Sequence, residues 1–147
     1  MKISKAGCAL FLGALCVAAT ANAFAQTSQY TKADCDRAWL GSDWPEVVLA
    51  CTSKAEDFEG YGDWSEKLIA AQLRARTSVA YAKLNRGALS TSERGKAETD
   101  LRPALTASAT DATTTQMIER AKALNQLLQS PKFVHDAENS DLLADIQ

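Results

Sequence analysis

The sequence is poor in histidine, proline and glycine, and each shortage narrows the range of folds and activities. Its 147 residues contain 1 histidine, 3 prolines and 7 glycines. The single histidine, His135, follows Pro131 in an acidic stretch, so neither a Ser-His-Asp nor a Cys-His catalytic centre is indicated. There is no glycine-rich phosphate loop and no metal-ligand motif. We therefore expect no catalytic residues, no metal and no cofactor, and a protein that is not an enzyme.

The sequence also lacks an excess of basic residues. Lysine and arginine number 16 against 18 aspartates and glutamates, which gives a formal net charge of −2 at pH 7. Nucleic-acid binding usually needs clustered positive charge to neutralise phosphates, so we expect no nucleic-acid partner. After the first 25 residues, no apolar run approaches the roughly 20 residues that a membrane span requires.

The first 25 residues predict a cleavable signal peptide. Lys2 and Lys5 precede an apolar run, Ala6–Ala19. The run is shorter than the roughly 20 residues of a membrane-spanning helix. Small residues at alternate positions follow the run, so we expect cleavage after Ala23 or Ala25. Loss of the two lysines shifts the formal net charge from −2 to −4. The expected location is the periplasm or the outside of the cell.

The four cysteines divide between the signal peptide and the rest of the chain. Cys8 and Cys16 are lost with the signal peptide, and Cys35 and Cys51 remain. An even pair in an oxidising compartment predicts a disulfide. Both cysteines lie eight residues from Asp43, at the expected turn of a helical hairpin, which places each about 12 Å from that turn. A bridge there would hold the two helices together.

Hydrophobic periodicity predicts helices along the rest of the chain. The expected helices are, by residue number, about 28–40, 44–59, 64–86, 92–107 and 113–129. Asp43 and Asp63 are good N-caps for the second and third helices, and each has a glutamate three residues later, as in a capping box. The third helix carries two neighbouring apolar stripes, so we expect it to pack on two sides and to form the centre of the domain.

Residues 26–130 are expected to form one all-α domain built from antiparallel helical hairpins. Residues 131–147 are acidic, and we expect them to form a flexible C-terminal tail. The alternative is a short docking helix that uses Leu142, Leu143 and Ile146.

Two stretches resemble tetratricopeptide-type helix pairs. Gly41–Cys51 resembles the turn and second helix of such a repeat, with Gly, Asp and an aromatic residue ahead of the helix. Ala80–Asn85 followed by Ala97–Leu105 resembles a second repeat, including its Ala-Leu ending. The resemblance covers roughly 75 residues and implies a short α-solenoid. A compact four- to five-helix bundle explains the same patterns.

The resemblance also implies which residues face a partner, because the first helix of each pair lines the inner surface of such a stack. The implied lining residues are Lys32, Asp36, Trp39, Gln72, Arg76, Val79 and Lys83. We expect a non-enzymatic exported binding or scaffold module that recognises a peptide or protein partner in the cell envelope. The alternative is a small helical-bundle inhibitor or protective factor that acts on an envelope enzyme.

Overall fold

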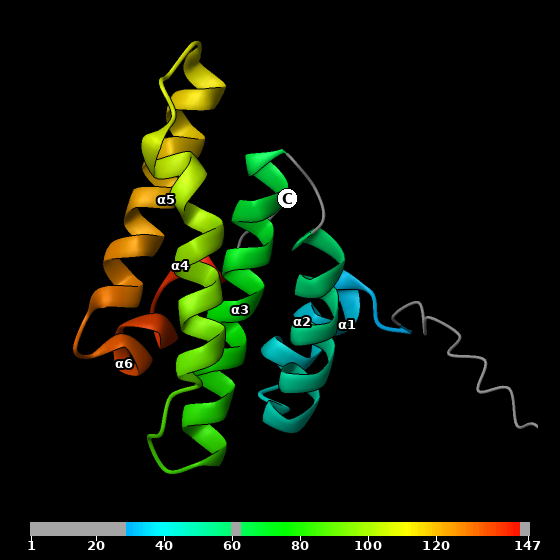
Figure 1. The fold of residues 1–147 in the computed structure, drawn as a ribbon. Coiled ribbons are helices and arrows are strands. Elements are labelled where there is room, and N and C mark those ends of the chain that lie inside the picture. The colour runs from blue at the N-terminus through cyan, green and yellow to red at the C-terminus, as the bar shows by residue number, and fades with distance from the viewer. Residues whose placement is uncertain (1–28, 60–62, 145–147) are drawn as a thin grey trace, which may run out of the picture.

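A computed structural model describes residues 29–59 and 63–144, and nearly all of them belong to packed helices. The elements are α1 (Lys32–Leu40), α2 (Trp44–Glu59), α3 (Trp64–Leu84), α4 (Thr91–Thr106), α5 (Ala112–Gln129), α6 (Phe133–Glu138) and the 3-10 turn η1 (Asp141–Leu143) (Figure 1). The described residues contain no strand, so the prediction of an all-α fold is confirmed. The expected signal peptide and its cleavage sites lie outside the described residues.

Capping side chains explain where the first helices begin. The Thr31 hydroxyl accepts a hydrogen bond from the Asp34 amide at 3.3 Å, and the Asp34 carboxylate accepts one from the Thr31 amide at 2.8 Å. This capping box makes α1 begin at Lys32, later than the sequence predicted. Asp43 and Asp63 accept hydrogen bonds from backbone amides at the starts of α2 and α3, as expected.

α3 is the central element of the fold, as its two apolar stripes predicted. Every residue from 70 to 80 is buried, and Figure 1 shows α3 between the α1–α2 hairpin and the pair α4–α5. One core cluster joins α3 to the hairpin and includes Val47 and Leu73. The other joins α3 to the C-terminal half and includes Leu101 and Leu124. Within the described ranges, no helix combines the length and apolar character that crossing a membrane requires.

Buried polar contacts fix α4 on α3. Arg74 of α3 is 0% exposed, forms an ion pair with Glu93 and lies 3.7 Å from Asp100, measured from Nε to Oδ2. The Ser78 hydroxyl donates to the Ser90 carbonyl oxygen at 3.1 Å. A buried guanidinium is costly without carboxylate partners, so these contacts determine how α4 lies on α3.

The stretch after Pro131, which the sequence predicted to be flexible, folds back onto the helices as α6 and η1. Phe133, Ala137 and Leu143 are at most 1% exposed and join the core formed by α3, α4 and α5. The expectation of a flexible tail is therefore wrong for residues 133–143. Its acidic composition suggested disorder, but three apolar anchors are enough to dock a short segment against a preformed core.

Candidate binding groove

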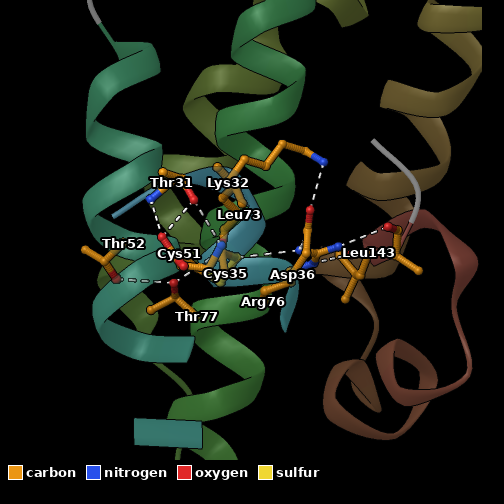
Figure 2. The surroundings of a disulfide bond; sticks show 12 residues. Thr31, Lys32, Cys35, Asp36, Cys51, Thr52, Leu73, Arg76, Thr77 and Leu143 are labelled. Carbon is orange, nitrogen blue, oxygen red and sulfur yellow. Dashed lines mark hydrogen bonds and ion pairs between the residues drawn. A yellow bond between two sulfur atoms is a disulfide. The ribbon is translucent and has the colours of Figure 1, made fainter. Parts of the chain in front are cut away.

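The candidate groove is the surface between α1 and α3 where the implied partner-facing residues lie. Its first wall is α1, which is joined to α2 through a cysteine of each helix. The sulfur atoms of Cys35 and Cys51 lie at disulfide distance, the Cα atoms are 4.9 Å apart, and both side chains are fully buried (Figure 2). The predicted pairing is thus confirmed. α2 is linked to α3 through the hydroxyls of Thr52 and Thr77, 3.2 Å apart. The position of α1 is therefore tied covalently to a helix that packs on α3.

Charged and aromatic side chains of α1 meet α3 across the groove. Nη1 of Arg76 lies 2.5 Å from Oδ1 of Asp36, and Nζ of Lys32 lies 3.1 Å from the other oxygen of that carboxylate. The Arg76 guanidinium also lies over the Trp39 ring, 5.5 Å from its centroid, in a cation–π contact. The structure thus brings together four of the seven residues that the repeat resemblance implied.

The two cations control the ionisation of Asp36. Partial burial raises the pKa of this carboxyl, but hydrogen bonds from Arg76 and Lys32, together with their positive charges, outweigh that effect. The pKa of Asp36 therefore lies below its ordinary value of 3.8, and the side chain is a carboxylate at neutral pH. With two cations and one anion, this part of the groove carries one net positive charge.

The middle of the groove is occupied by the protein's own C-terminal segment. Gln72 donates from Nε2 to the Leu142 carbonyl oxygen at 2.6 Å. Arg76 donates from Nε to the Leu143 carbonyl oxygen and from Nη2 to the Ala144 carbonyl oxygen, the latter at 3.1 Å. Gln72 and Arg76 are consequently 2% and 1% exposed. Their contact with a partner stays a prediction, and it requires this segment to move aside.

The Trp39 ring, over which Arg76 lies, also borders a cavity of about 390 Å³. Its lining residues are Trp39, Ser42, Trp44, Val79, Lys83 and Glu138. The Trp39 and Trp44 rings meet edge to face, with centroids 5.9 Å apart and planes at 77°. Nζ of Lys83 lies 5.9 Å from the centroid of Trp44 and pairs with Glu138 of α6. Three of the implied partner-facing residues, Trp39, Val79 and Lys83, therefore border this cavity, and Val79 is 0% exposed.

The sequence did not indicate three side chains of this cavity, Ser42, Trp44 and Glu138, or any of the backbone acceptors. Trp44 is the aromatic residue of the repeat-like stretch Gly41–Cys51, and it is half-buried and borders the cavity. The available signal was its place opposite Trp39 across the predicted turn, since a tight turn brings both rings together. Glu138 lies in the segment that was expected to be flexible. Every residue has a backbone carbonyl group, so the sequence could not indicate that those of residues 142–144 are the acceptors.

The groove offers hydrogen-bond donors, aromatic faces and paired charges. Aromatic residues and arginine are enriched where proteins recognise other polypeptides, and hydrogen-bond donors such as those of Gln72 and Arg76 can bind backbone carbonyl groups. Within residues 29–59 and 63–144, no group of three or more His, Cys, Asp or Glu side chains is arranged to hold a metal ion. His135 is exposed on α6.

Comparison with known proteins places the chain in no family. No protein-family model, curated protein or solved structure matches it. The likeness to tetratricopeptide pairs thus depends on the residues quoted above. The packing of several helices, each against its neighbour along the chain, is compatible with a helical-repeat fold.

Proposed function

We propose that the protein is a non-enzymatic exported binding module that recognises a peptide or protein partner in the cell envelope through the α1–α3 groove. The observation that carries this proposal is the cavity beside Trp39, Trp44 and Lys83, where four helices converge on open space. Tryptophan is enriched at the energetic centres of protein interfaces, because a half-buried indole offers a large apolar area and one polar group.

The order of the helices supports a tetratricopeptide-like interpretation of this groove. α1 packs on α2, α2 on α3 and α3 on α4, so the first two helices and the next two form successive hairpins. The first helix of each hairpin, α1 and α3, contributes the residues that border the groove. We propose that these first helices form the partner-facing surface, as they do in that family.

The cysteine pair supports the export that we propose. Disulfides persist in oxidising compartments, and the expected signal peptide would deliver the chain to one. Cell fractionation with mass measurement of the purified protein tests this directly. We expect a chain that begins after Ala23 or Ala25 and has Cys35 bonded to Cys51. A full-length cytoplasmic chain with two free thiols would contradict it.

Site-specific photo-crosslinking in the native envelope tests the binding function. A crosslinking residue in place of Ser42 would border the cavity, and one in place of Ser108 would lie exposed between α4 and α5. Both positions are serines in connections between helices, so Ser108 is a matched control. We expect a discrete partner adduct from position 42 and none from position 108. Equal or absent adducts at both positions would contradict the proposal.

A second pair of variants separates loss of the site from loss of the fold. Trp44 and Trp64 are each the first residue of a helix and each is half-buried, but only Trp44 borders the cavity. We expect Trp44→Ala to abolish the adduct from position 42 and Trp64→Ala to preserve it. If the captured partner is a lytic enzyme that loses activity on binding, the function becomes that of an inhibitor.

A further inference from the structure

The C-terminal segment lies in the groove in the way that a bound peptide would. Three consecutive carbonyl oxygens, those of Leu142, Leu143 and Ala144, accept hydrogen bonds from Gln72 and Arg76 of α3. Figure 2 shows Arg76 beside Leu143. Hydrogen bonds to the main chain of a peptide, together with a pocket for one of its side chains, are features of peptide recognition by proteins. One apolar anchor accompanies these bonds, since the Leu143 side chain is 0% exposed.

Residues 141–144 are held by fewer contacts than the helices around them. η1 spans three residues, Asp141–Leu143, and its main-chain contacts to α3 would be equally available to another polypeptide. The Lys83–Glu138 ion pair, which joins α6 to α3 near the cavity, is about one third exposed at both ends. Ion pairs that exposed contribute little to stability, roughly 0–1 kcal/mol. Leu143 and the carbonyl groups therefore supply most of the specific contacts.

The groove that would remain after the segment leaves is suited to receive an equivalent segment. Arg76 keeps its carboxylate partner, because Asp36 belongs to the hairpin that the disulfide holds. The cations Lys32 and Arg76 still outnumber that carboxylate, so partial negative charge on incoming carbonyl groups is favoured. The apolar space vacated by Leu143, between α3 and α5, would be open to another leucine.

We propose that residues 141–144 are a resident occupant of a peptide site, and that the partner presents a leucine whose own backbone carbonyl and those of its two neighbours are free. The partner displaces the resident segment and takes over its bonds to Gln72 and Arg76. The proposal rests on the proposed binding function and names the chemistry of its partner. Because the resident segment is tethered, it competes at an effective concentration of about 1 mM or more, so a free peptide binds the wild-type chain weakly.

The test uses the full chain and a fluorescent synthetic peptide with the sequence of Glu138–Ala144, capped at both ends. Peptide binding is measured by fluorescence anisotropy. Leu143→Ala in the protein removes the resident anchor but leaves the groove intact, so we expect the peptide to bind this variant at least about tenfold more tightly than wild type. The matched control is Leu142→Ala, which truncates the neighbouring half-buried leucine. We expect it to change the affinity by less than about threefold.

A second variant keeps the proposal testable if Leu143→Ala fails to fold. Insertion of a flexible Gly-Ser stretch of about 20 residues after Asn139 retains the resident segment but lowers its effective concentration. We expect a tighter peptide affinity in this chain too, by up to about tenfold. In either background Gln72→Ala should weaken peptide binding, because it removes the donor to the first carbonyl.

Two results would overturn the proposal. One is a folded Leu143→Ala chain with no better peptide binding than wild type. The other is concentration-dependent dimerisation of the wild-type chain that the peptide competes with, which would make a second copy the occupant. Neither result depends on the Ser42 adduct. An adduct from position 42 without peptide binding would therefore support the proposed binding function and contradict the proposed chemistry of the partner. Peptide binding without an adduct would support the peptide site and contradict binding of an envelope partner at the cavity.

Discussion

α3 buries two arginines, and the two sides of the helix hold them in different ways. Arg74 is 0% exposed and faces α4, where it pairs with Glu93 and lies near Asp100. Arg76 is 1% exposed and faces the groove, where it pairs with Asp36 and donates to backbone carbonyls of the C-terminal segment. The first arginine is held by side chains of a long helix. The second depends in part on a short segment at the edge of the fold.

This difference distinguishes the side of α3 that α4 covers permanently from the side where the C-terminal segment can be replaced. α4 cannot leave Arg74 without exposing a large core, which includes Leu101 and Ala104. On the groove side, the covalent link between Cys35 and Cys51 keeps Asp36 in place, and only the carbonyl groups can be exchanged. One side of α3 therefore acts as scaffold, and the other combines a fixed wall with an occupant that can leave.

The largest expected effect is the loss of stability on removing Arg74. Arg74→Ala leaves a cavity and brings Glu93 and Asp100 together without their shared cation, so we expect the free energy of unfolding to fall by about 3–5 kcal/mol. The matched variant Arg76→Ala should cost about 2 kcal/mol or less, because Asp36 is 30% exposed and keeps Lys32 as a partner. Urea denaturation measures both. Equal costs would remove the distinction between the two sides.

Loss of the disulfide is expected to have the next largest effect. The bridge closes a loop with a sequence separation of 16 residues, which predicts a loss of about 3 kcal/mol in Cys35→Ala/Cys51→Ala. Thermal and urea unfolding of the double variant against the oxidised wild type give the value. An unchanged unfolding midpoint would show that the α1–α2 hairpin does not depend on the bridge for its place.

Two buried leucines in the same core cluster test whether the C-terminal segment is held as firmly as the long helices. Leu128→Ala in α5 should cost about 3 kcal/mol, as expected for a buried leucine in a cooperative core. Leu143→Ala in η1 should cost about 1.5 kcal/mol, which matches the expected tenfold gain in peptide affinity, because the loss cannot exceed the free energy of docking its segment. Both side chains are 0% exposed, so burial alone predicts equal costs. Equal measured costs would contradict an independently docked segment.

The smallest expected effect is the pH dependence that Asp36 contributes. Its pKa is lower in the folded protein than in the unfolded chain, so its stabilisation is present above the ordinary value of 3.8 and is lost as pH falls through the lower folded value. Asp36→Asn should therefore be less stable than wild type at pH 7, by less than about 1 kcal/mol, with the difference shrinking below pH of about 4. Denaturation at several pH values gives the profile.

Asp111 provides a control outside the groove for this pH dependence. A hydrogen bond from the backbone amide of Thr114 lowers the pKa of Asp111 as well, at the start of α5. Asp111→Asn should show the same direction of pH dependence without altering the contacts of Arg76. If Asp36→Asn shows no pH dependence while Asp111→Asn does, the carboxylate of Asp36 does not stabilise the groove.

Much of the fold was accessible from local sequence signals. Asp43 and Asp63 marked helix starts because a side-chain acceptor at that position satisfies a free backbone amide. The equal spacing of Cys35 and Cys51 about the turn predicted their pairing, and the periodicity of 64–86 predicted a helix packed on two sides. These signals work because the interacting residues are close in sequence or lie on one regular helix.

The parts that the sequence did not reveal depend on contacts between distant residues. Leu143 docks in an acidic stretch whose composition is typical of disorder, and only the complementary space on α3 and α5 explains its burial. Arg74 carried no sign that its charge would be buried, since its carboxylate partners lie 19 and 26 residues later. The acceptors for Arg76 are carbonyl oxygens, which every residue possesses.

Hydrogen exchange of the intact wild-type protein tests most directly whether the C-terminal segment is a separable occupant. The amides of Leu143 and Ala144 are hydrogen-bonded to carbonyl oxygens within residues 140–144, and those of α4 belong to the permanent side. We predict that the first group exchanges through a local opening whose free energy is at least about 2 kcal/mol lower than that of the opening that exposes α4. Exchange of both groups at one common free energy would contradict it.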